Sequence, residues 1–269
     1  MCGLCGILTA PVKRSRSDLE RQLDVFSLLL LLSEHRGPYA TGAAWVKRDG
    51  TFRVEKAPLA ARHFIQTPCY ADFLNEAAGD ITVLMGHTCW PTRGSIHNHE
   101  DNHPQSTPPI LLCHNGHVPD ASRHFRRLQL PRTADVDSEL LARIAQRHAG
   151  GDGLDVQAFL ADLVLLDGRM SLALVATTRP EEIILLKGNM PLEVRVHAGR
   201  QVLVYASESR ILELALGADA GWALVPLRPG ECLVINTQAW TMQRVPFTFQ
   251  GIHSDAGNTY TGAITRKER

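Results

Sequence analysis

The chain has 269 residues, of which 44% are apolar and 21% charged, a composition typical of globular proteins with a sizeable core. Its 28 Lys and Arg residues balance 28 Asp and Glu residues, so neither a basic nucleic-acid-binding chain nor an acidic disordered one is expected. The longest apolar run, at 28–32, is far shorter than the ~20 residues that cross a bilayer. No apolar signal core follows a basic start, so we expect a cytoplasmic protein with no membrane or nucleic-acid partner.

The first half of the chain predicts one long helix among short strands. A capping box formed by Ser17 and Glu20 predicts a helix that runs to about Glu34. The pair Asp49-Gly50 predicts a hairpin between two strands. In chain order we expect a strand at 2–8, the hairpin strands at 41–47 and 52–57, a helix at 69–78, a strand at 81–87, a loop at 94–109 and a strand at 110–114.

The second half predicts helices followed by a series of strands. Helices are expected at 135–148, 155–165 and 208–216, and strands at 171–177, 182–187, 191–196, 202–206, 222–225, 231–236 and 240–246. Because the strands follow one another instead of alternating with helices, they favour antiparallel sheets covered by helices over a doubly wound parallel sheet. We expect an α+β fold with one domain over 1–249 and a loosely ordered tail over 250–269.

The most informative residue for chemistry is Cys2. The six cysteines do not suggest a disulfide framework in a reducing compartment, so most should be buried thiols. Removal of Met1 would leave Cys2 with both a thiol and a free α-amine, whose ordinary pKa of ~7.7–8.0 suits a general base. Taken alone, Cys2 is more simply explained as part of a buried strand.

Further motifs change that interpretation. They are Gly86-His87-Thr88-Cys89-Trp90-Pro91-Thr92-Arg93-Gly94, Asn102-His103-Pro104, and Cys113-His114-Asn115-Gly116 directly after a buried strand. With Cys2-Gly3 and Glu34-His35-Arg36-Gly37 they make the sequence resemble the class II glutamine amidotransferases. Two later segments, Gly168-Arg169-Met170-Ser171-Leu172-Ala173 and Ala206-Ser207-Glu208, extend the resemblance over nearly the whole chain.

The resemblance implies a four-layer αββα fold of the N-terminal-nucleophile type and assigns roles to several residues. Cys2 would attack the carboxamide carbon of L-glutamine, and the Asn115 side chain and the Gly116 backbone N–H would hold the oxyanion. The resemblance places substrate binding at Arg36, Trp90, Thr92, Arg93 and Asp137. It implies no metal and no organic cofactor.

The sequence departs from the family pattern at two positions. The family has an Arg that binds the substrate carboxylate where Cys89 stands, and a His where Arg93 stands. Arg93 is four residues further along the same loop, so its guanidinium could replace the missing one. Alternatively, the site accepts a different γ-glutamyl substrate or has lost activity.

The expected function is a stand-alone glutaminase that delivers ammonia to a separate synthetase protein. One alternative is a catalytically weak glutamine-binding regulatory module, as the Cys89 departure suggests. Another is a zinc protein that uses Cys2-x-x-Cys5 or the histidines His97, His99, His103, His114 and His117. The sequence has neither a second Cys-x-x-Cys nor a His-Glu-x-x-His motif, which argues against zinc.

Overall fold

Two antiparallel sheets form the centre of the protein in the computed structural model, which describes residues 2–77 and 79–255. The seven-stranded sheet has the order β13 (Ala223–Leu224), β11 (Glu193–His197), β12 (Val202–Ala206), β1 (Gly3–Thr9), β4 (Ile81–Cys89), β2 (Ala40–Lys47) and β3 (Phe52–Ala57). The six-stranded sheet has the order β15 (Thr241–Pro246), β14 (Glu231–Asn236), β10 (Glu182–Lys187), β9 (Arg169–Ala176), β6 (Ile110–His117) and β5 (Gln105–Thr107). A small ribbon pairs β7 (Ala149–Gly150) with β8 (Gly153–Leu154).

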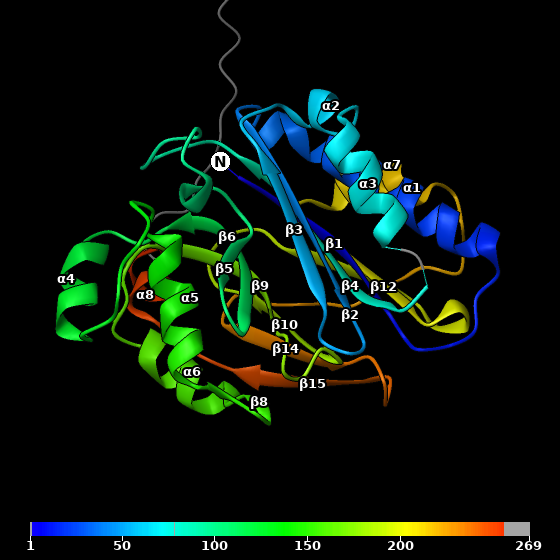
Figure 1. Cartoon of the computed structure of the whole chain (residues 1–269). Helices are drawn as coiled ribbons and strands as arrows, with labels where there is room; N and C mark the ends of the chain where they lie inside the picture. The colour runs from blue at the N-terminus through cyan, green and yellow to red at the C-terminus, as the bar shows by residue number, and fades with distance from the viewer. Residues whose placement is uncertain (1, 78, 256–269) are drawn as a thin grey trace, which may run out of the picture.

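Helices cover the outer face of each sheet, so the molecule has four layers (Figure 1). The seven-stranded sheet is covered by α1 (Arg16–Ser33), α2 (Ala61–Phe64), α3 (Pro68–Glu76) and α7 (Ser209–Leu216). The six-stranded sheet is covered by α4 (Ala121–Arg127), α5 (Ser138–Arg147) and α6 (Val156–Leu163), and α8 (Gln250–Asp255) packs beside them. Short 3₁₀ turns occur at Glu34–Arg36, His99–Asp101 and Ala198–Arg200. The expected α+β fold, with two antiparallel sheets in an αββα arrangement, is confirmed.

Three apolar layers hold these four layers of secondary structure together. Between the sheets, Leu4 and Leu8 of β1 meet Leu111 of β6 and other strand residues. Outside the first sheet, Ile7 packs under α1 and the neighbouring helices. Because β1 has apolar neighbours on both faces, every one of its residues is buried. This explains why its sequence is a continuous apolar run without polar alternation.

Several local features differ from the sequence-based expectations. The capping box of α1 is formed by Ser15 and Asp18, two positions before the expected Ser17 and Glu20. The expected loop at 94–109 contains β5, which forms a hairpin with β6 across Pro108 and Pro109. Helix α4 was not expected, because its N-cap, Asp120, makes no side-chain capping bond and adopts a positive φ of 54°.

The first residues after 249 are helical, although we expected a loosely ordered tail there. Residues 250–255 form α8, which is anchored at its start by a hydrogen bond from Gln250 N to Leu166 O (3.0 Å). The fully buried Phe249 and the adjoining Ile252 attach this segment to the core of the six-stranded sheet. The rest of the expected tail, 256–269, lies outside the described residues.

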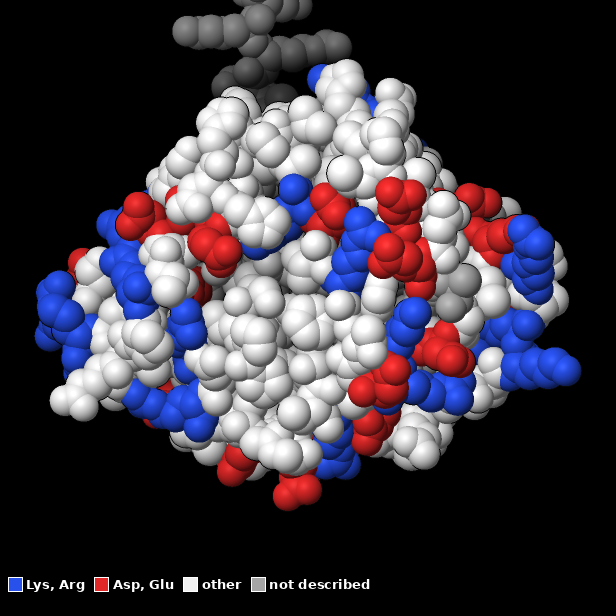
Figure 2. All heavy atoms as spheres, viewed as in Figure 1, with Lys and Arg blue, Asp and Glu red and all other residues white. Residues whose placement is uncertain are grey.

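The surface shows no dominance of one charge. Figure 2 shows a largely uncharged area in the middle of this face, with acidic and basic side chains on both sides of it. Within the described ranges, no helix is long and apolar enough to cross a membrane.

The two candidate caps of α1 can be separated by substitution. Ser15 Oγ accepts a hydrogen bond from Asp18 N (3.1 Å), and the Asp18 carboxylate accepts one from Ser15 N (3.2 Å). Ser15→Ala should therefore lower the free energy of unfolding by about 1 kcal/mol in urea denaturation. Ser17→Ala, which removes a hydroxyl 2.9 Å from that of Ser15, is the matched control and should cost less than about 0.5 kcal/mol. Equal losses would contradict the assignment.

Candidate active site

The start of β1 fixes the position of Cys2. β1 is paired on both sides, with β12 and with β4, and Gly3 lies opposite Thr88 in the second pair. One further step in this antiparallel register places Cys2 opposite Cys89. The Cys2 carbonyl accepts a hydrogen bond from Arg36 Nε (2.8 Å), and its Sγ lies 3.7 Å from the Trp90 carbonyl oxygen. Cys2 is therefore held by its backbone, and the residue as a whole is half-buried.

A narrow cavity of about 30 Å³ opens next to the Cys2 thiol. Its walls come from the ends of β1, β4 and β6, the start of α5 and the loop that follows β4. Most of the site residues expected from the sequence line this cavity, namely Cys2, Trp90, Thr92, Arg93, Gly116 and Asp137. The fold thus gathers segments that are more than a hundred residues apart in the sequence.

Asn115 and Gly116 lie in the last part of β6, not after the strand as expected. Asn115 is fully buried, and neither its amide nitrogen nor its amide oxygen has a hydrogen-bond partner in the described part of the chain. Gly116 has a φ of 152°, and a Cβ at this position would lie 1.9 Å from the Arg169 carbonyl oxygen. A free amide donor and a glycine are therefore fixed by pairing with β9, beside the cavity that Cys2 lines.

Asp137 and Arg36 are both buried, but they occupy different places. Asp137 is at the N-cap position of α5 but makes no side-chain capping bond; it lines the cavity, where its carboxylate accepts a hydrogen bond from Val118 N (2.5 Å) and lies 3.2 Å from His117 Nδ1. Arg36 does not line the cavity, since its guanidinium contacts the Cys2 carbonyl and the Glu208 carboxylate. Arg36 thus supports the backbone of Cys2 from outside the cavity.

The loop after β4 forms the outer wall of the cavity. Trp90 is 45% exposed and makes an edge-on contact with Tyr39, with ring centroids 5.1 Å apart, so it is not a core residue. Thr92 and Arg93 are also exposed. An exposed wall of this kind can change position without disturbing the core.

The surroundings of Cys2 favour its thiolate. The pKa of Cys2 is well below the ordinary thiol value, chiefly because the Cys89 thiol hydrogen-bonds to it and further because His87 does; burial opposes the shift. The pKa of Cys89 is raised in return, because its proton is held toward the Cys2 sulfur and its own side chain is buried. The sequence alone did not identify His87 and Cys89 as neighbours of the Cys2 thiol. Their register opposite β1 was the only available signal.

Two further histidines, His103 and His114, line the cavity next to His87. His87 Nε2 donates a hydrogen bond to the His114 carbonyl oxygen (3.0 Å), and the His87 ring stacks on that of His103 with centroids 4.0 Å apart. Burial lowers the pKa of both His103 and His114, which keeps these imidazoles neutral at neutral pH. Across the described ranges, no three His, Cys, Asp or Glu side chains are grouped so that they could hold a metal ion.

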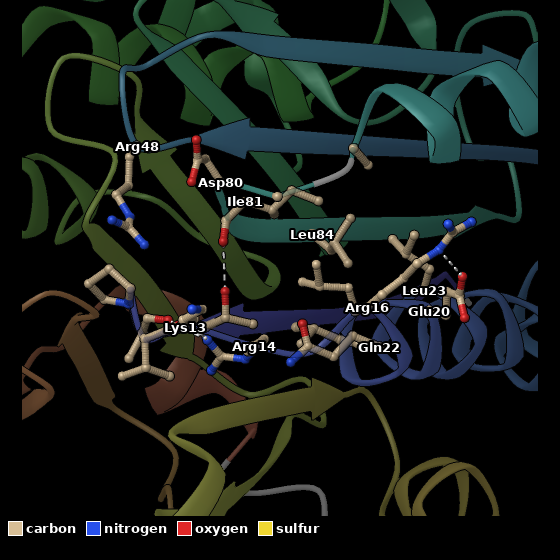
Figure 3. A pocket seen from close by; sticks show the side chains of 18 of the residues that line it. Lys13, Arg14, Arg16, Glu20, Gln22, Leu23, Arg48, Asp80, Ile81 and Leu84 are labelled. Carbon is tan, nitrogen blue, oxygen red and sulfur yellow. Dashed lines mark hydrogen bonds and ion pairs between the residues drawn. The ribbon is translucent and has the colours of Figure 1, made fainter.

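A larger cavity, of about 770 Å³, lies at the opposite end of β1 (Figure 3). Because β1 has seven residues and a strand rises about 3.3 Å per residue, this cavity lies roughly 20 Å from Cys2. Its basic residues are already engaged in part, since Arg14 donates to four backbone carbonyls and Arg16 pairs with Glu20. Cys2 and the unpartnered side-chain amide of Asn115 both lie at the other end of β1 in the described structure.

Comparison with solved structures supports the fold independently of the site. The chain superposes on glutamine phosphoribosylpyrophosphate amidotransferase from B. subtilis with a TM-score of 0.67 and 20% identity, over 92% of this chain and 49% of that one. No protein-family model matches the sequence. At this level of identity, the likeness describes the fold alone.

Curated relatives extend the likeness to the sequence. Glutamine–fructose-6-phosphate aminotransferase (isomerizing) from Staphylococcus epidermidis is 31% identical over 180 residues, covering 63% of this chain and 28% of that protein. The Pyrococcus horikoshii protein of the same name is 27% identical over 209 residues, which cover 76% of this chain and 32% of that protein. In sequence and in fold the chain is thus similar to a domain of the class II, N-terminal-nucleophile glutamine amidotransferases. It spans about a third of the length of the curated relatives it matches.

The contact between Cys2 and Cys89 can be tested by thiol alkylation. The thiolate is the reactive form, so a lowered pKa extends the reaction of Cys2 with iodoacetamide to lower pH. We expect Cys89→Ala to shift the pH–rate profile of alkylation to higher pH and to slow the reaction at neutral pH. The measurement uses a Cys69→Ser background, which removes the exposed competing thiol. An unchanged profile would show that Cys89 does not stabilise the thiolate.

Proposed function

We propose that this domain hydrolyses L-glutamine to glutamate and ammonia through a thioester on Cys2. The observation that carries the proposal is the meeting of three groups at one small cavity. These are a thiol with a lowered pKa on Cys2, the unpartnered buried amide of Asn115 and the glycine backbone of Gly116. A nucleophile beside free hydrogen-bond donors is the arrangement that acyl transfer requires.

The first half of the reaction forms the thioester. The Cys2 thiolate, held by the Cys89 thiol and His87, attacks the side-chain carboxamide carbon of glutamine. Negative charge moves to the carbonyl oxygen, where Asn115 Nδ2 and the Gly116 N–H donate hydrogen bonds. The α-amine of Cys2, free once Met1 is removed, protonates the nitrogen as the C–N bond breaks and ammonia leaves.

The second half regenerates the enzyme. The same amine, now neutral, takes a proton from water, which attacks the thioester carbon. The oxyanion forms again at Asn115 and Gly116, the C–S bond breaks, and glutamate leaves. Arg36 acts as a positioning residue, because its hydrogen bond to the Cys2 carbonyl fixes the backbone next to that amine.

Substrate recognition would use two charged residues that line the cavity. Asp137, at the start of α5, would pair with the substrate α-ammonium, and Arg93 would bind its carboxylate in place of the Arg that Cys89 replaces. A cavity of about 30 Å³ holds about one water molecule. We therefore propose that the exposed segment with Trp90, Thr92 and Arg93 moves outward to admit glutamine.

We further propose that the ammonia passes to a separate synthetase protein. The curated relatives are named as aminotransferases, and the chain matches only about a third of their length, which leaves the acceptor chemistry to other sequence. The acceptor would bind near the cavity mouth around Trp90.

The proposal is tested by glutamate release from L-glutamine, with Met1 removal checked by mass spectrometry. Asn115→Ala should lower kcat about a hundredfold or more with little change in KM, because the amide acts on the developing oxyanion. Protein that retains Met1 should be inactive, because the free α-amine then belongs to Met1 and lies one residue away from the Cys2 thiol. Glutamine binding without release by Met-trimmed protein would instead identify a glutamine-sensing module.

The role of Arg93 gives a separate prediction. If its guanidinium binds the substrate carboxylate, Arg93→Ala should raise KM about tenfold to a hundredfold, the expected cost of losing a charge-assisted hydrogen bond. Arg93→Lys should recover part of the loss, because an ammonium cannot make the bidentate contact. The matched control is Arg16→Ala, an exposed arginine at the far end of β1. Unchanged kinetics in Arg93→Ala would reject this assignment.

A further inference from the structure

Two thiols face each other at the mouth of the catalytic cavity. The antiparallel register of β1 and β4 continues from Gly3 and Thr88 to Cys2 and Cys89, and both cysteines line the cavity. Directly opposite residues of an antiparallel pair have Cα atoms about 4.5–5.5 Å apart, with side chains on the same face. This separation lies within the about 4.4–6.8 Å that a disulfide spans.

The other described cysteines cannot take the place of Cys89. Cys5 is three positions after Cys2, so alternation along the strand directs it to the opposite face of the sheet, where it packs under the helices. Cys113 is buried between the sheets, and Cys232 is buried in the core on the far side of the six-stranded sheet. Cys69 is exposed on α3. Every described cysteine is a free thiol in this structure.

We propose that Cys2 and Cys89 form a peroxide-sensitive dithiol, in which oxidation joins the two sulfurs in a reversible disulfide and removes the nucleophile. Cys2 is the attacking thiol because it is partly exposed, whereas Cys89 is only 8% exposed and follows as the resolving thiol. The lowered pKa of Cys2 supports this order, since the thiolate is the form that reacts with peroxide.

The reaction balances with hydrogen peroxide as the oxidant. The Cys2 thiolate attacks one peroxide oxygen, the O–O bond breaks, and Cys2 sulfenic acid and hydroxide form; the hydroxide takes a proton from solvent. The Cys89 sulfur then attacks the Cys2 sulfur, the S–O bond breaks, and the released hydroxide leaves as water with the Cys89 proton. Each sulfur gives up one electron and the peroxide takes two. A small-molecule thiol reverses the change by exchange and is itself oxidised.

The disulfide has two consequences for the site. It occupies the Cys2 lone pair that would attack the substrate carbonyl, so glutamine hydrolysis stops. It also protects Cys2, because a sulfenic acid with an adjacent thiol condenses before further peroxide converts it to the irreversible sulfinic acid. The loss of activity rests on the proposed function, whereas disulfide formation rests on the geometry alone.

The experiment treats full-length Cys69→Ser protein with hydrogen peroxide, quenches with iodoacetamide, and measures intact mass and digested peptides. We expect the protein to lose the mass of two hydrogen atoms, to yield a peptide linking Cys2 to Cys89, and to return to its starting mass with dithiothreitol. Untreated Cys69→Ser should match the wild type in glutamate release. Oxygen addition at Cys2 without a linked peptide, or a link between other cysteines, would overturn the proposal.

Cys89→Ser in the same background provides the matched variant. Without the resolving thiol, Cys2 should gain the mass of oxygen atoms and should not be restored by dithiothreitol. Restoration as complete as in the parent would overturn the protective role. Peptide mapping of the parent decides the proposal even if this variant folds poorly. If the reduced protein releases no glutamate but forms the linked peptide after peroxide treatment, the proposed function is wrong while the dithiol proposal is supported.

Discussion

The pairing of β1 on both of its sides is the constraint on which the site depends. A residue just outside a strand end normally has freedom to move, but Cys2 continues a strand that is hydrogen-bonded to β12 and β4 together. Side chains reinforce this position, since Ser207 Oγ accepts a hydrogen bond from Leu4 N (2.9 Å). Gly3 leaves no room for adjustment, because a Cβ there would lie 2.6 Å from Thr88 Oγ1. Cys2 is thus held in a fixed position by the strand that it continues.

The space between the sheets changes character along its length. Through most of it, strand residues such as Leu8 and Leu185 pack as an apolar layer. At the end next to Cys2, His87, His103 and Asn115 are buried in their place. Burying polar groups costs free energy, above all when they lack partners, as both ring nitrogens of His103 and the Asn115 amide do in the described structure. Such a concentration of unsatisfied groups at one end is best explained by a ligand or reaction that uses them.

Sequence reasoning recovered the architecture because its signals are local. Continuous apolar runs identified strands buried on both faces, and Asp49-Gly50 gives the hairpin between β2 and β3. Features that depend on distant neighbours were not recoverable in the same way. The engagement of Arg36 by Glu208 and the position of Cys89 opposite Cys2 depend on the register of segments far apart in the chain. No periodicity reports such a register.

The sheet order also determines how this domain can meet other chains. Each sheet ends in a strand with unpaired backbone groups on its outer side, and such edges invite strand addition. Two of these edge strands, β13 and β5, are only two and three residues long. The longer edges carry charge or proline, with Arg53 and Lys56 on β3 and Arg244 and Pro246 on β15. All four edges are therefore poor templates for aggregation, and this leaves the helical faces and the cavity mouth as the surfaces suited to specific association.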